Sequence, residues 1–260
     1  MGRALITGAS SGLGEEFAWV LAAERNNLVL VARNEPKLHA LAEDIRQKMD
    51  VQVEVLPADL STKDGVQAVA ERVGSAHDPV TLLVNNAGGG LGQDFVGGSL
   101  EREIHAEKVM VRAVLALTHA AVQAMVPRGR GTVINVASVT AMTVQGTYSA
   151  HKAWVKTFTE GLAADLEGTG VNVTAVLPGL MHTQFHERTH VDSSQWPEFT
   201  FLSTTAVVNA TLHAARHRRV IVVPGMLYKA AYAALKFAPR VLVRKIAGPR
   251  ISGRSAGIPK

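Results

Sequence analysis

Thr7-Gly8-Ala9-Ser10-Ser11-Gly12-Leu13-Gly14 directly follows the apolar run Arg3 to Ile6 and precedes a helical pattern from Glu15 to Arg25. This order predicts a buried strand, a glycine-rich turn and a helix. Gly8 can adopt the backbone angles of a tight turn, Gly12 lets a pyrophosphate approach the main chain, and Gly14 lets helix and strand pack closely. The N–H groups at the helix start attract an anion. An ordinary βα turn has the same appearance, so these residues alone do not decide the function.

The rest of the chain alternates between two kinds of segment. Short runs rich in Val, Leu and Ile predict strands near 28–32, 51–56, 80–84, 131–137, 171–176 and 219–223. Helical patterns lie near 35–49, 62–75, 101–127, 147–167 and 202–217. Uniformly apolar strands separated by helices are typical of a parallel sheet covered on both faces. We therefore predict an α/β fold with a single doubly wound parallel sheet.

A second group of residues can carry proton chemistry. Tyr148 and Lys152 are four residues apart in a predicted helix, and Ser138 comes just after the strand near 131–137. The spacing of four places both side chains on one helix face, where the lysine ammonium would lower the tyrosine pKa from its ordinary value near 10. Ser138 would donate a hydrogen bond to a substrate oxygen. A lone Tyr-x-x-x-Lys pair is usually an exposed helical pair, so this hypothesis depends on the accompanying motifs.

Together with Asn85-Asn86-Ala87-Gly88 and Pro178-Gly179-Leu180-Met181-His182-Thr183, these motifs resemble the short-chain dehydrogenase/reductase family from Arg3 to about Gly225. The resemblance implies a Rossmann-type fold, a nicotinamide cofactor, and Ser138, Tyr148 and Lys152 as catalytic residues. It also implies pairing into a homodimer or homotetramer through the helices near 101–127 and 147–167. The implied cofactor-binding residues are Gly8, Ser10, Ser11, Gly12, Leu13, Gly14, Arg33, Asp59, Leu60, Asn86, Ala87, Gly88, Tyr148, Lys152, Pro178, Gly179 and Thr183.

The end of the second strand indicates which nicotinamide cofactor is bound. A carboxylate at this place would bind the ribose 2′-hydroxyl of NAD and repel the extra phosphate of NADP. Here the strand ends Val31-Ala32-Arg33, without an acid. The planar guanidinium of Arg33 suits phosphate oxygens, although it could also be merely solvated. We therefore predict NADP(H).

The sequence departs from the family pattern in two places. Met110 stands where the family usually has an asparagine that holds a water of the proton relay, and methionine cannot donate an amide hydrogen bond. In addition, Ser138 and Tyr148 are about three residues closer together than is usual, which shortens the loop 139–147 beside the substrate. The shortening can make room for a larger substrate, and it would look the same in an inactive protein.

Composition and the remaining motifs set further limits. The 260 residues are enough for one well-buried domain, predicted over 1–225. The absence of cysteine excludes disulfides and thiol catalysis. We expect a cytoplasmic protein because the first strand begins close to Met1 and no run of about 18 apolar residues is present. His182, His186 and His190 recur every four residues, but we predict that no metal is bound because such histidines are more often solvated or face substrate.

The segment 226–260 forms a basic amphipathic extension. It carries eight Lys or Arg residues and no Asp or Glu, so it accounts for the chain's net charge of +5. Helical patterns from Met226 to Ala238 and from Arg240 to Ala247 place apolar side chains beside these cations. This suits peripheral contact with the inner, anionic face of a membrane. Alternatively, the segment packs on the substrate mouth or on a second subunit; no nucleic-acid motif is present.

These observations predict an NADPH-dependent reductase of a hydrophobic ketone or 3-oxoacyl compound. The tail from Phe199 to Gly248 also loosely resembles actinobacterial members of the family thought to reduce long 3-oxoacyl chains. The alternative is a catalytically weakened NADP-binding protein that acts as a sensor or membrane-associated scaffold.

Overall fold

The computed structural model describes residues 2–182 and 196–246. Seven parallel strands form one sheet in the order β3-β2-β1-β4-β5-β6-β7. Their bounds are β1 Arg3–Thr7, β2 Asn27–Ala32, β3 Val53–Pro57, β4 Leu82–Asn85, β5 Gly131–Val136, β6 Val171–Val176 and β7 Ile221–Val222. The chain moves outward from β1 to β3 and then returns to pair β4 with the other side of β1. The switch in direction therefore lies between β1 and β4, where such sheets bind ligands at the carboxyl ends of the strands.

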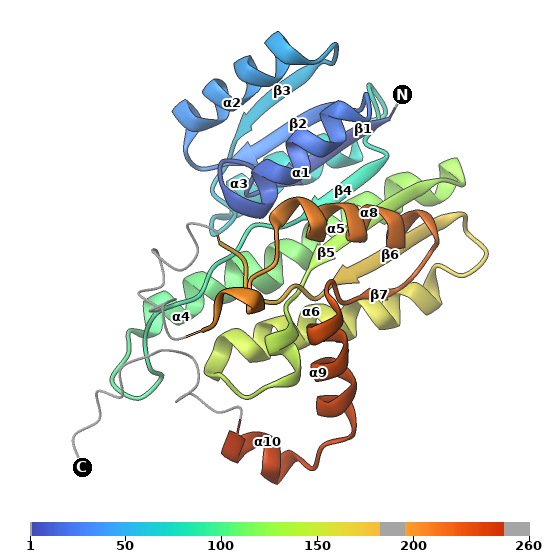
Figure 1. Cartoon of the computed structure of the whole chain (residues 1–260). Helices are drawn as coiled ribbons and strands as arrows, with labels where there is room; N and C mark the ends of the chain where they lie inside the picture. Colours follow the sequence, from blue (N-terminus) through green and yellow to red (C-terminus); the bar gives the residue numbers. More distant parts are fainter. Residues whose placement is uncertain (1, 183–195, 247–260) are drawn as a thin grey trace.

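Helices cover both faces of the sheet (Figure 1). Three of them pack on one face: α1 Gly12–Ala23, α2 Glu35–Lys48 and α8 Thr204–Arg216. The opposite face is covered by α3 Lys63–Gly74, α5 Ala113–Met125 and α6 Gly146–Asp165, with α4 Leu100–Glu107 leading into α5. This arrangement is the predicted doubly wound, Rossmann-type α/β fold.

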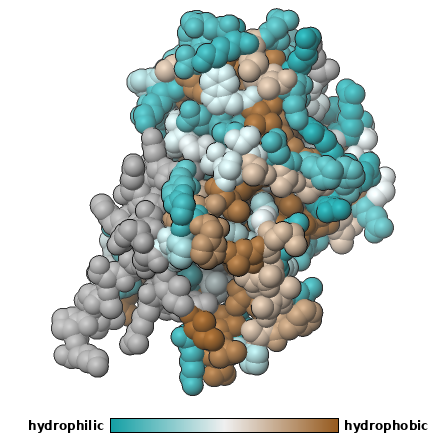
Figure 2. Space-filling view, in the orientation of Figure 1, coloured by the Kyte–Doolittle hydropathy of each residue, from teal (hydrophilic) through white to brown (hydrophobic). Residues whose placement is uncertain are grey.

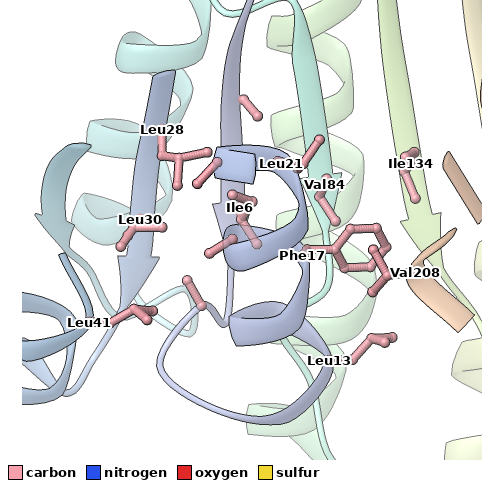
Figure 3. Packing of buried hydrophobic residues seen from close by; sticks show 14 of the residues in the cluster. Ile6, Leu13, Phe17, Leu21, Leu28, Leu30, Leu41, Val84, Ile134 and Val208 are labelled. Atoms are coloured by element: carbon pink, nitrogen blue, oxygen red, sulfur yellow. The ribbon is translucent and has the colours of Figure 1, made fainter. Parts of the chain in front are cut away.

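The uniformly apolar strands supply both layers of the core. Successive residues alternate between the faces, so that Ile6 packs against α1 while Leu5 faces α3 and α5. Phe17 of α1 is fully buried at the centre of the first layer (Figure 3). Burying such a side chain contributes about 1.5–3 kcal/mol to folding.

The long predicted helix near 101–127 is interrupted. A π-helical turn, Lys108–Arg112, separates α4 from α5, and Met110 is buried at its centre. By length and composition the helical stretch Leu100–Arg128 could cross a membrane, but its buried side chains pack on the sheet and α3. It serves here as a core helix of the α/β layer.

The segment after β7 forms two helices, α9 Met226–Phe237 and α10 Arg240–Ile246. Figure 1 shows both beyond the β7 edge, at the end of the molecule opposite α2 and β3. Tyr228 and Tyr232 of α9 pack against the buried cluster that contains Val155 of α6 and Val223. One face of the extension is therefore docked on the main domain.

Candidate active site

The glycine-rich turn connects β1 to α1. Gly8 has a φ of +67°, a conformation that favours glycine. A Cβ at Gly14 would overlap the carbonyl oxygen of Gly8 and the side-chain amide of Asn86. Helix α1 begins at Gly12, earlier than predicted, and its N-cap Ser11 makes no side-chain capping bond. The N–H groups of this first turn are therefore available to a phosphate.

Thr7 joins this turn to the Asn86–Gly88 segment that follows β4. Its Oγ1 accepts hydrogen bonds from the N–H groups of Asn86 (2.9 Å) and Ala87 (3.0 Å), and Asn86 Nδ2 donates to the Thr7 carbonyl (2.9 Å). The structure thus brings the glycine turn and the Asn-Asn-Ala-Gly motif together at the β1–β4 switch. No role is predicted for Thr7 from the sequence, because a hydroxyl at a strand end has no distinctive pattern.

Below this point a chain of buried polar side chains crosses the sheet. Asn85 Nδ2 donates to Thr118 Oγ1 (3.0 Å) and to Asn135 Oδ1 (2.9 Å), and Asn135 Nδ2 donates to Thr159 Oγ1 (3.0 Å). Thr159 Oγ1 in turn donates to the carbonyl of Val155 (2.7 Å). These bonds fix β4 and β5 to α5 and α6 directly beneath the site.

The residues predicted for the adenosine end lie at the ends of β2 and β3. Arg33 is exposed just after β2, and Asp59 follows β3. Burial, the largest influence on Asp59, raises its pKa. The hydrogen bonds from Ser61 and the charges of Arg33 and His105 together outweigh burial, so the pKa of Asp59 is lowered. Leu60 is buried beside Asp59. The charge of Arg33 therefore acts on Asp59, and its exposed guanidinium can bind a phosphate.

Ser138, Tyr148 and Lys152 lie together beyond the carboxyl end of β5. Ser138 is hydrogen-bonded to the Tyr148 hydroxyl, and the N–H of Thr140 donates to Ser138 Oγ (3.2 Å). Lys152 is buried, and its Nζ donates to the Val136 carbonyl (2.8 Å). A Cβ at Gly88 would lie 3.7 Å from that Nζ, so the turn after β4 also borders this cluster.

Burial, and not Lys152, governs the pKa of Tyr148 in the structure. Burial raises the pKa of Tyr148 to about 12, and the Ser138 hydrogen bond opposes this only in part. Lys152 Nζ lies 5.7 Å from the centroid of the Tyr148 ring because it bonds to Val136 instead. Burial also lowers the pKa of Lys152 to about 8. At neutral pH the tyrosine keeps its proton, as a proton donor requires.

Met110 fills the space behind these residues. It is 1% exposed and forms a buried cluster with Leu91 and Ala106, against which Tyr148 packs. A Cβ at Gly88 would come within 3.0 Å of Met110 Cγ. An apolar side chain therefore occupies the place where the family pattern has an asparagine.

The shortened loop 139–147 is closely hydrogen-bonded. It contains a 3₁₀ turn, Val139–Met142, and Ser149 Oγ bonds to both Thr143 Oγ1 and the Gln145 N–H, each at 3.0 Å. Thr147 Oγ1 donates to Glu103 of α4 (2.6 Å). No role is predicted for Ser149 from the sequence, because its hydrogen bonds lie within an irregular loop that has no recognisable motif.

The last predicted segment begins beside this cluster. Pro178 and Gly179 follow β6, whereas Thr183, His186 and His190 lie outside the described residues. His182 pairs with Glu198 (2.8 Å) and stacks on Phe201, with the ring centroids 4.0 Å apart. Its ring is thus held by a carboxylate and an aromatic side chain.

A family model described as short chain dehydrogenase matches residues 3–217. The chain belongs to the short-chain dehydrogenase/reductase family. This short-chain dehydrogenase is 33% identical over 183 residues to an uncharacterized oxidoreductase of Staphylococcus saprophyticus, a match that covers 69% of this chain and 78% of the relative. Members of the family bind a nicotinamide cofactor, and the glycine cradle and the available helix N–H groups fit such a group.

Solved structures resemble this short-chain dehydrogenase over most of its length. A short-chain dehydrogenase from Sphingobium yanoikuyae in complex with NADPH has a TM-score of 0.85 and 31% identity, covering 100% of this chain and 99% of that one. A bulky-bulky ketone specific alcohol dehydrogenase from Comamonas testosteroni has a TM-score of 0.78 and 27% identity, covering 92% and 96%. A Burkholderia phymatum member in complex with NAD has a TM-score of 0.79 and 26% identity, covering 89% and 92%.

Proposed function

We propose that this oxidoreductase is an NADPH-dependent carbonyl reductase that converts a hydrophobic ketone or 3-oxoacyl compound to the alcohol. The observation that carries the proposal is the meeting of Ser138, Tyr148 and Lys152 beside the β1–β4 switch. The proton donor Tyr148 and the hydrogen-bond donor Ser138 lie beside the position at which this fold binds a dinucleotide.

The residues divide the reaction between them. A bound nicotinamide supplies the hydride for the carbonyl carbon. Tyr148 gives its hydroxyl proton to the carbonyl oxygen, which becomes the alcohol oxygen. Tyr148 then regains a proton from water. Ser138 donates a hydrogen bond to that oxygen as its charge develops. Lys152 would hold the nicotinamide ribose, and its positive charge would favour the tyrosinate formed in the step.

The preference for NADPH rests on the end of β2. Arg33 is exposed there, and no acid occupies the place that would bind the ribose of NAD. The structural likeness to the NADPH complex from Sphingobium yanoikuyae supports this choice. Asp59, Leu60, Asn86 and Ala87 would line the adenosine half of the cofactor.

The proposals of a hydrophobic substrate and of a membrane contact depend on the exposed surface of α9 and α10. Exposed apolar side chains include Phe237, 83% exposed, and Val241, Leu242 and Ile246. Figure 2 shows hydrophobic side chains gathered over the part of the molecule where these helices lie in Figure 1. The two helices carry five Lys or Arg residues and no acid, namely Lys229, Lys236, Arg240, Arg244 and Lys245. We propose that this surface contacts anionic lipid near the source of an apolar substrate.

Pairing with a second copy is proposed through α5 and α6. Leu115 and Val126, on or next to α5, are exposed large apolar residues that such pairing would cover.

Met110 favours a second candidate function. Because buried Met110 stands in place of a relay asparagine, in the cluster against which Tyr148 packs, a protein that binds NADPH without efficient turnover is the alternative. Such a protein would act as a sensor or scaffold.

The absorbance of NADPH, followed with a graded series of ketones and 3-oxoacyl thioesters, tests the proposal. We expect turnover that increases with chain length and is lost in Tyr148→Phe, with NADPH binding retained. Tight NADPH binding without turnover across the whole series would instead favour the sensor.

A further inference from the structure

Tyr228 of α9 contacts the segment that follows β6 in two ways. Its hydroxyl accepts a hydrogen bond from the N–H of Leu180 (3.0 Å) and donates one to the carbonyl of Thr200 (2.8 Å). Its ring covers Gly179, where a Cβ would overlap three of the ring carbons. The tyrosine thus fixes the backbone positions of Gly179 and Leu180.

The neighbouring contacts make this arrangement rigid. Leu180 also accepts a hydrogen bond from Leu202 N–H (2.8 Å), and Met181 pairs with Leu202 in a parallel β-bridge. Burial raises the pKa of Tyr228, so its hydroxyl keeps the proton that it donates to Thr200.

The C-terminal helices also contact the loop 139–147 of the site. Arg240, at the start of α10, donates to the Met142 carbonyl of the loop 139–147 (3.2 Å). The helices therefore support both segments that adjoin Ser138.

We propose that Tyr228 is a positioning residue that holds Gly179 and Leu180 where they bind the nicotinamide half of the cofactor, an inference that rests on the proposed function. The tyrosine acts through the backbone of these two residues, whereas the phosphate turn and Arg33 lie on other elements. Its loss therefore affects the two halves of the cofactor differently. The helix α9 then belongs to the catalytic unit instead of being an appendage.

Tyr228→Phe tests the proposal because it keeps the ring on Gly179 and removes both hydrogen bonds. The affinities to measure are those for NADPH and for adenosine 2′,5′-bisphosphate, which lacks the nicotinamide half. We expect the NADPH Kd to rise about fivefold, the effect of about one net hydrogen bond, while the bisphosphate Kd stays unchanged. The matched control is Tyr232→Phe, one turn further along α9 in the same apolar cluster, which is expected to leave both affinities unchanged.

Two outcomes would overturn the proposal: an unchanged NADPH Kd in Tyr228→Phe, or equal weakening for NADPH and the bisphosphate. Failure of the proposed function looks different, because the wild-type protein would then either not bind NADPH or bind it without reducing any ketone.

Gly179→Ala provides a second route that does not depend on the hydroxyl. The added methyl group would press on the Tyr228 ring and displace the segment, so NADPH binding is expected to weaken and bisphosphate binding to persist. In the Tyr228→Ala background the ring is absent, and adding Gly179→Ala is expected to cause little further loss. Fully additive losses would show that the two residues act independently, against the proposal.

Discussion

Replacing Lys152 by methionine tests the cost of burying its charge. Burial lowers the pKa of Lys152 from 10.5 to about 8. At about 1.4 kcal/mol for each tenfold change in the proton equilibrium, the charged form costs the folded state about 3 kcal/mol. Below about pH 8 the lysine is charged in both states and the full cost is present. Between about pH 8 and 10.5 the unfolded chain binds more protons, so stability increases as pH rises.

From about pH 7 to about pH 9.5 we therefore expect the wild-type free energy of unfolding to gain about 2 kcal/mol relative to Lys152→Met, which has no such group to titrate. Urea unfolding followed by tryptophan fluorescence, at one fixed protein concentration, measures the difference at each pH. The control is Lys229→Met, at an exposed position on α9.

Parallel pH profiles for wild type and Lys152→Met would refute the reasoning. They would show that water reaches the ammonium in the folded protein, and that burial does not govern this group.

Further predictions concern the cofactor, the turn, the reaction and the extension. Arg33→Ala is expected to raise the NADPH Kd about tenfold or more, because charge-assisted hydrogen bonds are lost, while the NADH Kd changes little; equal losses in titrations with both cofactors would exclude a 2′-phosphate role. Gly14→Ala should lower the free energy of unfolding by about 1–3 kcal/mol, as overpacking does, and a wild-type melting curve would contradict the close approach to Gly8. The kcat/KM for reduction should fall as pH rises through about 8, where Lys152 loses its charge; a profile that stays flat to about pH 10 would argue against its role. Co-sedimentation should show binding to phosphatidylglycerol vesicles, at about 1 kcal/mol for each cation at the surface, and little binding to phosphatidylcholine; equal binding to both would speak against the charge of α9 and α10.

Much of the fold could be predicted because its signals are local. Apolar runs mark the strands within a few residues of their observed ends, and Gly8 and Gly14 lie where the backbone turns and packs closely. The π-helical turn around Met110 was missed, because one extra residue in a helix leaves no mark in a pattern of apolar spacing.

The sequence indicated side chains that the structure brings together at the candidate site, but it did not indicate what governs their pKa values. The spacing of Tyr148 and Lys152 places both on one helix face, yet the lysine bonds to Val136 and burial dominates both pKa values. The contact between Tyr228 and Gly179 joins two distant parts of the chain, so no local pattern could reveal it.

The buried amide and hydroxyl chain beneath the site restricts how the sequence can diverge. Replacing Asn135 alone would leave Asn85 and Thr159 with buried polar atoms that have lost a partner, at a cost of about 1–3 kcal/mol. Replacing the whole set by apolar side chains of similar shape can be nearly neutral. These positions on two strands and two helices are therefore expected to change together during evolution, as a single inherited unit, or to stay as they are.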